Sequence, residues 1–203
     1  MSRPDVITLI LLRHAAHERV DRILCGRMPG VSLGEEGMHQ AALLGAQLER
    51  HAPDALFTSP LERARMTAEV LGGVLNLTPQ VSPALTEIDC GEWTGREFAE
   101  LREDPRWLRW NRERAASRPP GGETMGEAGE RVLDFATGLR RRYPNGVVAL
   151  VSHADVIKAT LAAVLGLTLD AHDRFDIAPA SMSTVVLWEG GGKVVGLNAV
   201  PEQ

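Results

Sequence analysis

The chain has 203 residues, of which 44% are hydrophobic and 24% are charged, and its formal net charge is −5. This composition is typical of a folded soluble protein and excludes a disordered polar chain, and the length fits a single domain over residues 1–203. The acidic balance argues against a general nucleic-acid or membrane surface, because such surfaces carry an excess of basic residues.

The cysteine content and the N-terminal sequence bear on the compartment. Cys25 and Cys90 are the only cysteines, which is too few for a disulfide framework. The apolar run near the N-terminus is short and ends in charge, so it lacks the layout of a signal peptide. No segment approaches the roughly 20 apolar residues of a membrane span. We therefore expect a cytoplasmic protein in a reducing setting.

Strand and helix patterns alternate along the first half of the chain. The run from Val6 to Leu12 is continuous and apolar, as expected for a strand covered on both faces. Apolar residues then recur at helical spacing from about Met38 to Leu48. The stretch "DALFTSP" predicts a second short strand, followed by a helix that begins at Pro60.

The second half continues this alternation. The stretch "MGEAGERVLDFATGLRRRY" predicts a helix, and "VVALVSHADVIKATLAAVLG" predicts a strand followed by a helix. Near the end, "STVVLWEGGGKVVGLNAV" predicts a β-hairpin around Gly190 to Gly192. The alternation indicates an α/β fold of three layers, in which a mostly parallel central sheet has helices on both faces.

Two of the predicted strands end in the same polar pattern. In "ITLILLRHAA" and "VVALVSHAD" an apolar strand runs into a polar residue, a histidine and an alanine, which places His14 and His153 at strand ends where open α/β sheets bind ligands. A lone histidine there is more often structural, but a pair at equivalent places beside Arg13 disfavours that reading. The charge of Arg13, at the end of a buried strand, requires an anionic partner.

A third cation follows the second predicted strand. Arg63 lies in the first turn of its helix, where the helix dipole repels a cation unless an anion binds beside it, whereas Arg65 fits a solvated helix arginine. Two arginines and two histidines around one crevice suit a dianionic group, for which phosphate is the obvious choice. A leaving group also needs an acid to protonate it. The stretch "LTEIDCGEWTG" offers three, between which spacing does not choose: Glu87, Asp89 and Glu92.

The chain contains five motifs in a suggestive order: "LLRHA", "SPLERARMTAEVL", "LTEIDCGEWTG", "GGETMGEAGERV" and "VVALVSHADVIKATLA". Together they resemble the histidine phosphatase superfamily, whose fold is phosphoglycerate mutase-like. The resemblance implies that His14 is the nucleophile that becomes phosphohistidine and that Arg13 grips the phosphoryl oxygens. It also implies that Arg63 and His153 complete the phosphate pocket, and that Glu87 donates a proton to the leaving oxygen.

A metal-independent phosphomonoester hydrolase, acting on a small phosphorylated metabolite without a cofactor, is the function that this resemblance implies. A positioned acid would contribute roughly 10²- to 10⁴-fold to such a reaction. A phosphoglycerate mutase-type phosphotransferase and a non-catalytic phosphate-binding module remain as alternatives. A metal site is disfavoured, because the histidines lack the usual ligand spacing and the arginines oppose a cation. A homodimer is kept as a candidate assembly.

The loop after the first histidine departs from the family pattern. Ala15 stands where most members have glycine, and "AAHERVDRILCGRMPG" lacks the asparagine that touches phosphate in many members. The candidates to replace that contact, as a substrate loop, are His17, Arg19 and Arg22.

A second irregular segment, from Arg102 to Arg118, carries six arginines against three acids. It is either a lid that meets an anionic substrate or a solvated helix that packs Trp107 and Trp110 on one face. The "GGETM" motif just after it has two interpretations as well. It either brings Glu123 or Thr124 near the site or caps a helix through Thr124.

Overall fold

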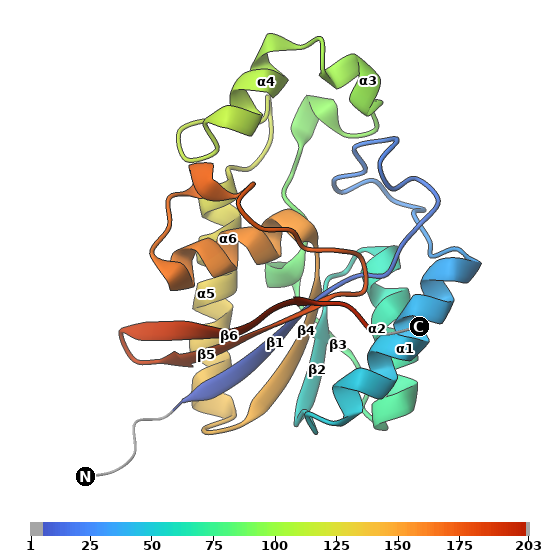
Figure 1. The fold of residues 1–203 in the computed structure, drawn as a ribbon, viewed down its shortest axis with the longest axis vertical. Coiled ribbons are helices and arrows are strands. Elements are labelled where there is room, and N and C mark those ends of the chain that lie inside the picture. The colour runs from blue at the N-terminus through green and yellow to red at the C-terminus, as the bar shows by residue number, and fades with distance from the viewer. Residues whose placement is uncertain (1–5, 202–203) are drawn as a thin grey trace.

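In the computed structural model, which describes residues 6–201, six strands form one mixed sheet (Figure 1). From edge to edge the strands run β3, β2, β4, β1, β5 and β6. Their bounds are β1 Ile7–Arg13, β2 Ala55–Thr58, β3 Gln80–Val81, β4 Val147–Ser152, β5 Met182–Trp188 and β6 Gly191–Ala199. The first four of these strands in the sheet order are parallel, whereas β5 lies antiparallel to β1, and β6 to β5. The mostly parallel sheet and the C-terminal hairpin are both as predicted.

The two central strands, β1 and β4, place the predicted histidines at the same end of the sheet. β1 pairs with β4 in parallel, and the register sets Arg13 beside Ser152, the last residue of each strand. The next residues along the two chains are His14 and His153. The main-chain N–H of His14 donates to the carbonyl of Ser152 at 3.0 Å, which continues the pairing past the end of β1. Both histidines therefore leave the sheet at the same edge.

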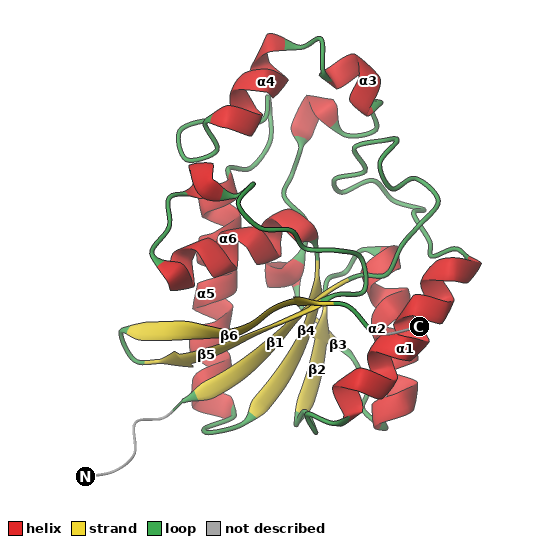
Figure 2. Cartoon of the chain, viewed as in Figure 1, coloured by secondary structure: helices red, strands yellow, loops and turns green. Residues whose placement is uncertain are grey.

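Helices cover both faces of the sheet, which gives the predicted three layers (Figure 2). α1 (Glu35–Glu49) and α2 (Glu62–Leu75) lie on one face; α5 (Met125–Arg142) and α6 (Ala154–Leu165) lie on the other. Successive residues of β1 point to opposite faces, because side chains alternate along a strand. Ile10 and Leu12 pack toward α1 and α2, while Leu9 and Leu11 pack toward α5 and α6. All four are buried, which explains the continuous apolar run.

A further layer of short helices lies beyond the carboxyl edge of the sheet (Figure 1). Its elements are the 3-10 turns η2 Gly91–Trp93 and η3 Leu169–Ala171, and the helices α3 Phe98–Leu101 and α4 Pro105–Arg112. The 3-10 turn η1 Pro83–Leu85 instead packs against α5 and β4. Trp93 is buried at the centre of the layer, with the ring of Trp107 edge-on at 5.4 Å and the ring of Trp110 at 6.4 Å. The predicted packing of Trp107 and Trp110 on one helix face is confirmed.

Acids neutralise much of the positive charge in this layer. Exposed ion pairs join Arg106 to Asp104 and Arg109 to Glu113. Arg114 differs because it is buried: it donates to a carboxylate oxygen of Asp155 at 3.0 Å and lies over the ring of Trp110 at 4.4 Å. The arginines thus serve mainly to hold the layer together, which favours the packing interpretation over the lid.

Two boundaries differ from the sequence-based expectation. α2 begins at Glu62, and the extended backbone of Leu61 forms its N-cap, so Pro60 precedes the helix instead of opening it. β3 has only two residues, too short to leave a periodic signal, and no strand is expected there from the sequence. The capping prediction is confirmed at α5, where Thr124 and Glu127 form a reciprocal capping box.

Candidate phosphate-binding and catalytic site

His14, Arg63 and His153 form one hydrogen-bonded group at the carboxyl edge of the sheet. The two histidine ring centroids lie 5.1 Å apart. Arg63, in the first turn of α2, lies between them: its Nε donates to Nε2 of His14 at 3.2 Å, and its Nη2 lies 3.2 Å from Nδ1 of His153. All three side chains are buried. The structure therefore brings together three residues that the sequence places in separate motifs.

The partners of the two rings determine where their protons lie. Nδ1 of His14 is 2.8 Å from the carbonyl of Ala15, which can only accept, so this nitrogen carries the hydrogen and Nε2 keeps a lone pair, which accepts from Nε of Arg63. Nδ1 of His153 accepts from Arg63, so its Nε2 carries the hydrogen, 2.8 Å from the hydroxyl of Ser59. Both rings are assigned as neutral tautomers from these contacts.

The surroundings keep both rings uncharged. Burial, followed by the positive charge of Arg63, holds the pKa of His14 well below its ordinary value. The same two causes act in the same order on the pKa of His153. At neutral pH, His14 thus presents an unprotonated Nε2 at the surface of the group, as a nucleophile requires.

Two guanidinium groups have buried N–H donors that no described residue satisfies. Arg13 donates through Nη1 to the carbonyl of Ile177 at 2.6 Å, but its Nε has no partner among residues 6–201. Arg63 donates through Nη2 to the carbonyl of Gly26 at 2.7 Å, while its Nη1 is likewise unpartnered within the described chain. An unsatisfied buried donor costs about 1–3 kcal/mol, more when it is charged. Such a cost at two arginines beside the unprotonated ring of His14 indicates a site for an oxyanion.

Glu87 is the carboxyl group nearest to this cluster among the three that the sequence left open. Its Oε2 lies 4.0 Å from Nδ1 of His153, and its Oε1 accepts from the main-chain N–H of Ile88 at 2.8 Å. Burial, and then the negative charge of Asp155, raise the pKa of Glu87 to about 7, although Arg63 acts in the opposite direction. Because the ring of His153 is neutral, the two groups do not form an ion pair, and both protonation states of Glu87 are accessible near neutral pH.

The other two acids of this motif have other partners. A carboxylate oxygen of Asp89 accepts from the main-chain N–H of Gly91 at 2.9 Å, and the other lies 3.5 Å from Arg27. Glu92 is exposed and pairs with Arg106 at 3.4 Å. Of the three candidates, the geometry selects Glu87.

The three candidates in the substrate loop differ clearly in their burial and contacts. The ring of His17 stacks on the ring of His14, with centroids 5.5 Å apart. Nδ1 of His17 accepts from the main-chain N–H of Arg19, which leaves the ring hydrogen on Nε2. Burial, with Arg63 and Arg13, lowers the pKa of His17 to about 4, so it is a neutral donor at pH 7. Arg19 and Arg22 are exposed, and the Arg19 guanidinium contacts the sulfur of Met28.

Main-chain and hydroxyl groups complete the site, and these were missed by sequence reasoning. Gly26 has a φ of +47°, and a Cβ there would press on Thr94 and Cys90, so glycine suits the turn that aims its carbonyl at Arg63. Ser59 and Thr67 hold His153 and the main chain of Ala15. The only signal for them in the sequence was Ser59, a serine directly after a strand. A contact made by a main-chain carbonyl does not depend on the residue type, so the sequence does not reveal it.

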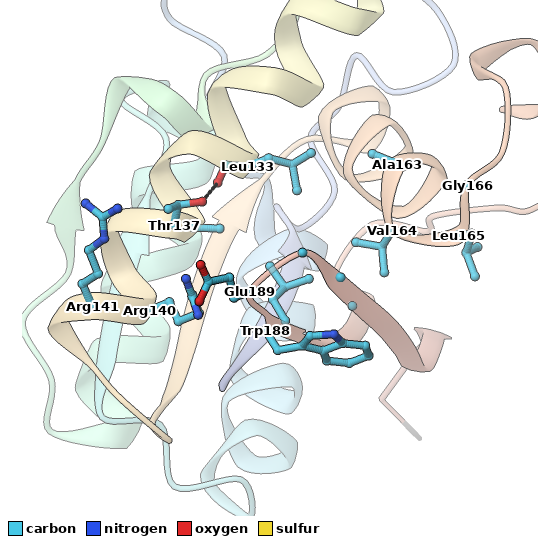
Figure 3. Close-up of a pocket in the computed structure, with 15 residues that line it drawn as sticks. Leu133, Thr137, Arg140, Arg141, Ala163, Val164, Leu165, Gly166, Trp188 and Glu189 are labelled. Atoms are coloured by element: carbon cyan, nitrogen blue, oxygen red, sulfur yellow. Dashed lines mark hydrogen bonds between the residues drawn. The ribbon is translucent and has the colours of Figure 1, made fainter. Parts of the chain in front are cut away.

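A hollow of about 860 Å³ lies away from this site, between the ends of α5 and α6 and the β5–β6 hairpin (Figure 3). Leu133, Arg141, Leu165 and Trp188 are among the residues that line it. Leu187, also in its wall, pairs with Ile7 at the opposite end of β1 from His14. This hollow is therefore separate from the cluster of Arg63 and the two histidines.

Residues 6–201 hold neither a metal-binding cluster nor a membrane-spanning helix. No three or more histidine, cysteine, aspartate or glutamate side chains come together there in a grouping able to hold a metal ion. No helix in this part of the chain combines the length and apolar character that crossing a bilayer requires.

Comparison with known proteins gives matches over nearly the whole chain. The model of the histidine phosphatase superfamily (branch 1) matches residues 9–200. Phosphoserine phosphatase 1 of Hydrogenobacter thermophilus is 32% identical over 198 residues, which are 95% of this chain and 92% of that protein. A bifunctional protein of Mycobacterium tuberculosis is 31% identical over 195 residues, 93% of this chain, and the match spans about half of that protein, 52%. A solved structure of a mycobacterial glucosyl-3-phosphoglycerate phosphatase superposes with a TM-score of 0.86 at 25% identity, covering 96% of this chain and 99% of that one.

Proposed function

The chain belongs to the histidine phosphatase superfamily (branch 1) and is a phosphatase, and we propose that it hydrolyses small phosphate monoesters through a phosphohistidine formed on Nε2 of His14. One observation carries the proposal: the unprotonated Nε2 of His14 lies beside two buried guanidinium groups with unsatisfied donors. A nucleophile and an oxyanion site thus share one pocket. The proposal needs only side chains of this chain and water.

In the first step, the lone pair on Nε2 of His14 attacks phosphorus in line with the ester oxygen. The P–N bond forms as the P–O bond to the alcohol breaks, and the Glu87 carboxyl gives its proton to the leaving oxygen. Arg13 and Arg63 bind the equatorial phosphoryl oxygens, where preorganised cations stabilise the charge of the transition state. The neutral His153 lines the same pocket and orients Arg63 through the contact at 3.2 Å.

In the second step, the Glu87 carboxylate takes a proton from water while the water oxygen attacks phosphorus. The P–N bond breaks, His14 recovers its lone pair and inorganic phosphate leaves. Glu87 is again protonated, so one group serves as acid and then as base. Its pKa of about 7 matches this double role, because both protonation states are accessible near neutral pH.

We propose that His17 replaces the missing phosphate-contacting asparagine. It lies against His14 and offers a neutral N–H from its Nε2. We assign less direct roles to Arg19 and Arg22, because both are exposed.

The substrate belongs to the class of small phosphorylated metabolites. The phosphoserine and glucosyl-3-phosphoglycerate phosphatases that this chain resembles differ in what surrounds the phosphate ester, so the shared part is the phosphoryl group itself. We further propose a cytoplasmic site of action, supported by two buried cysteines that are both free thiols. A homodimer stays a prediction.

The test is hydrolysis of p-nitrophenyl phosphate and of a panel of phosphometabolites, phosphoserine and 3-phosphoglycerate included, in the presence of a chelator. Turnover that survives chelation and disappears in His14→Ala, together with an acid-labile phosphoryl adduct on the intact protein, supports the proposal. Transfer of that phosphoryl group to a phosphoglycerate instead of water would favour the mutase alternative. Inactivity towards every substrate, with retained phosphate binding, would favour a binding module.

A further inference from the structure

Two arginines hold the main chain on both sides of Glu87. Arg131, on α5, donates from its two terminal nitrogens to the carbonyls of Ala84 and Thr86. Arg27 donates through Nε to the carbonyl of Glu87 itself at 2.8 Å. Three of the four carbonyls from residue 84 to residue 87 are therefore bound by guanidinium groups from distant parts of the chain.

Glu123 joins these two arginines. Its Oε2 accepts from Nη2 of Arg27 at 2.8 Å and from Nη2 of Arg131 at 3.1 Å, and its Oε1 accepts from Nε of Arg131 at 2.9 Å. The Glu123 and Arg131 side chains are only 16% and 21% exposed. Charge-assisted hydrogen bonds of this kind, partly shielded from water, fix geometry more firmly than neutral ones.

The same network reaches the phosphate pocket through the loop that carries Arg27. Gly26 accepts from Nη2 of Arg63 at 2.7 Å, and the next residue binds the carbonyl of Glu87. Consecutive residues thus hold the guanidinium that lies on His14 and the main chain of the acid. This connection ties the position of Glu87 to that of the Arg63 guanidinium.

We propose that Glu123 is a positioning residue, which acts through Arg27 and Arg131 to hold the Glu87 carboxyl at the leaving oxygen. The inference rests on the proposed function and assigns a role to a residue that the reaction steps do not use. The need for it is physical: a general acid must come within about 2.6–3.2 Å of the oxygen that it protonates. Glu87 lies between the 3-10 turns η1 and η2, where no helix or strand ladder fixes the main chain.

The test compares substrates with good and poor leaving groups. p-Nitrophenolate leaves readily and needs little protonation, whereas the alkoxide of β-glycerol phosphate needs the acid. In Glu123→Gln we expect kcat/KM for β-glycerol phosphate, which reports the first step, to fall at least about tenfold, because part of the 10²- to 10⁴-fold contribution of a general acid is lost. We expect kcat/KM for p-nitrophenyl phosphate to fall less than about threefold. Hydrolysis of the phosphohistidine, in which Glu87 acts alike for both substrates, does not enter kcat/KM. The control is Glu130→Gln, an exposed glutamate on α5, the helix that carries Arg131, and it should change the rate with neither substrate.

A second pair of variants keeps the inference open to refutation if Glu123→Gln folds poorly. Arg27→Met removes the bond to the Glu87 carbonyl at a side chain that is 36% exposed, and should reproduce the selective loss on the alkyl ester. In a Glu87→Gln background, Glu123→Gln should add almost nothing, because residues that act as a unit are not additive.

The outcomes also separate this inference from the proposed function. An equal loss of kcat/KM on both esters, or no loss on either, would overturn the positioning role. A wild-type protein that forms no phosphohistidine would overturn the proposed function itself, whatever the variants do.

Discussion

Nε of Arg63 lies 3.2 Å from Nε2 of His14 and donates its hydrogen to it, so the proposed nucleophile and the neighbouring cation already share one hydrogen bond. This contact has two effects. In addition to burial, which is the larger cause, the charge of Arg63 lowers the pKa of His14 and keeps the ring unprotonated. The contact also aims a guanidinium at the place where phosphorus would bond. Once the lone pair forms a P–N bond it can no longer accept this hydrogen, which then becomes available to a phosphoryl oxygen.

Arg63→Met should therefore reduce kcat/KM by about 10³-fold or more, the scale of a well-placed arginine in phosphoryl transfer. The same variant should unfold at a Tm no lower than the wild type, because Arg63 is 2% exposed and carries an unsatisfied Nη1. The measurement pairs steady-state kinetics with thermal unfolding. Arg65→Met, two residues along the same helix and exposed, is the control. A fully active Arg63→Met would remove this arginine from the mechanism.

Much of this arrangement could be predicted from the sequence because it follows from regular elements. Parallel strands end at a common edge, so the repeated strand–histidine pattern was enough to bring His14 and His153 together. A cation in the first turn of a helix, where the helix dipole disfavours it unless an anion binds, was enough to single out Arg63 over Arg65.

The choice of the acid could not be made from spacing. Glu87, Asp89 and Glu92 lie in an irregular segment whose path is set by hydrogen bonds to Arg27 and Arg131, residues far away along the chain. The periodicities of helices and strands carry no information about such contacts. The family resemblance pointed to Glu87, and the geometry gives the physical reason for the choice.

Activity should fall as the pH rises through about 7. Burial and Asp155 raise the pKa of Glu87 to about 7, and the acid must be protonated in the first step. The loss should be steep for an alkyl phosphate and shallow for p-nitrophenyl phosphate. Because the pKa of His14 is strongly lowered, no fall attributable to this ring is expected near pH 6.5. A pH–rate profile with both esters measures this, and an alkaline limb of equal steepness for the two would contradict it.

Glu87→Gln should unfold at a higher Tm than the wild type at pH 8. The pKa of Glu87 in the folded protein lies above its unfolded value, so folding takes up a proton and stability is lost as the pH rises from about 4.5 through about 7. Glutamine carries no charge to bury, so the gain should be large at pH 8 and shrink towards pH 5. Thermal unfolding of the two proteins at these pH values decides it. A constant difference would mean that ionisation of Glu87 costs the fold nothing.

His17 should matter more for phosphate binding than its two charged neighbours. His17→Ala removes a neutral donor stacked on His14, and we expect inorganic phosphate to inhibit about tenfold more weakly as a result. His17→Asn keeps an N–H donor and should recover part of this affinity. Arg19→Ala and Arg22→Ala, both exposed, should stay within about twofold. Competitive inhibition constants for phosphate test all four variants, and a larger effect at either arginine would transfer the contact to that residue.

Asp155 should set the alkaline limit of the reaction from a distance. After burial, its negative charge is the main cause of the raised pKa of Glu87, and its own carboxylate accepts from the buried Arg114 at 3.0 Å. Asp155→Asn removes the charge while keeping an oxygen for Arg114. The alkaline limb for an alkyl phosphate should then move to lower pH, so that activity at pH 6 changes little and activity at pH 7.5 falls. The variant should also lose about 2 kcal/mol of stability, because Arg114 is left without a counter-ion. Asp134→Asn, an exposed carboxylate on α5, should leave the limb in place. A limb that stays fixed in Asp155→Asn would mean that burial alone raises the pKa of Glu87.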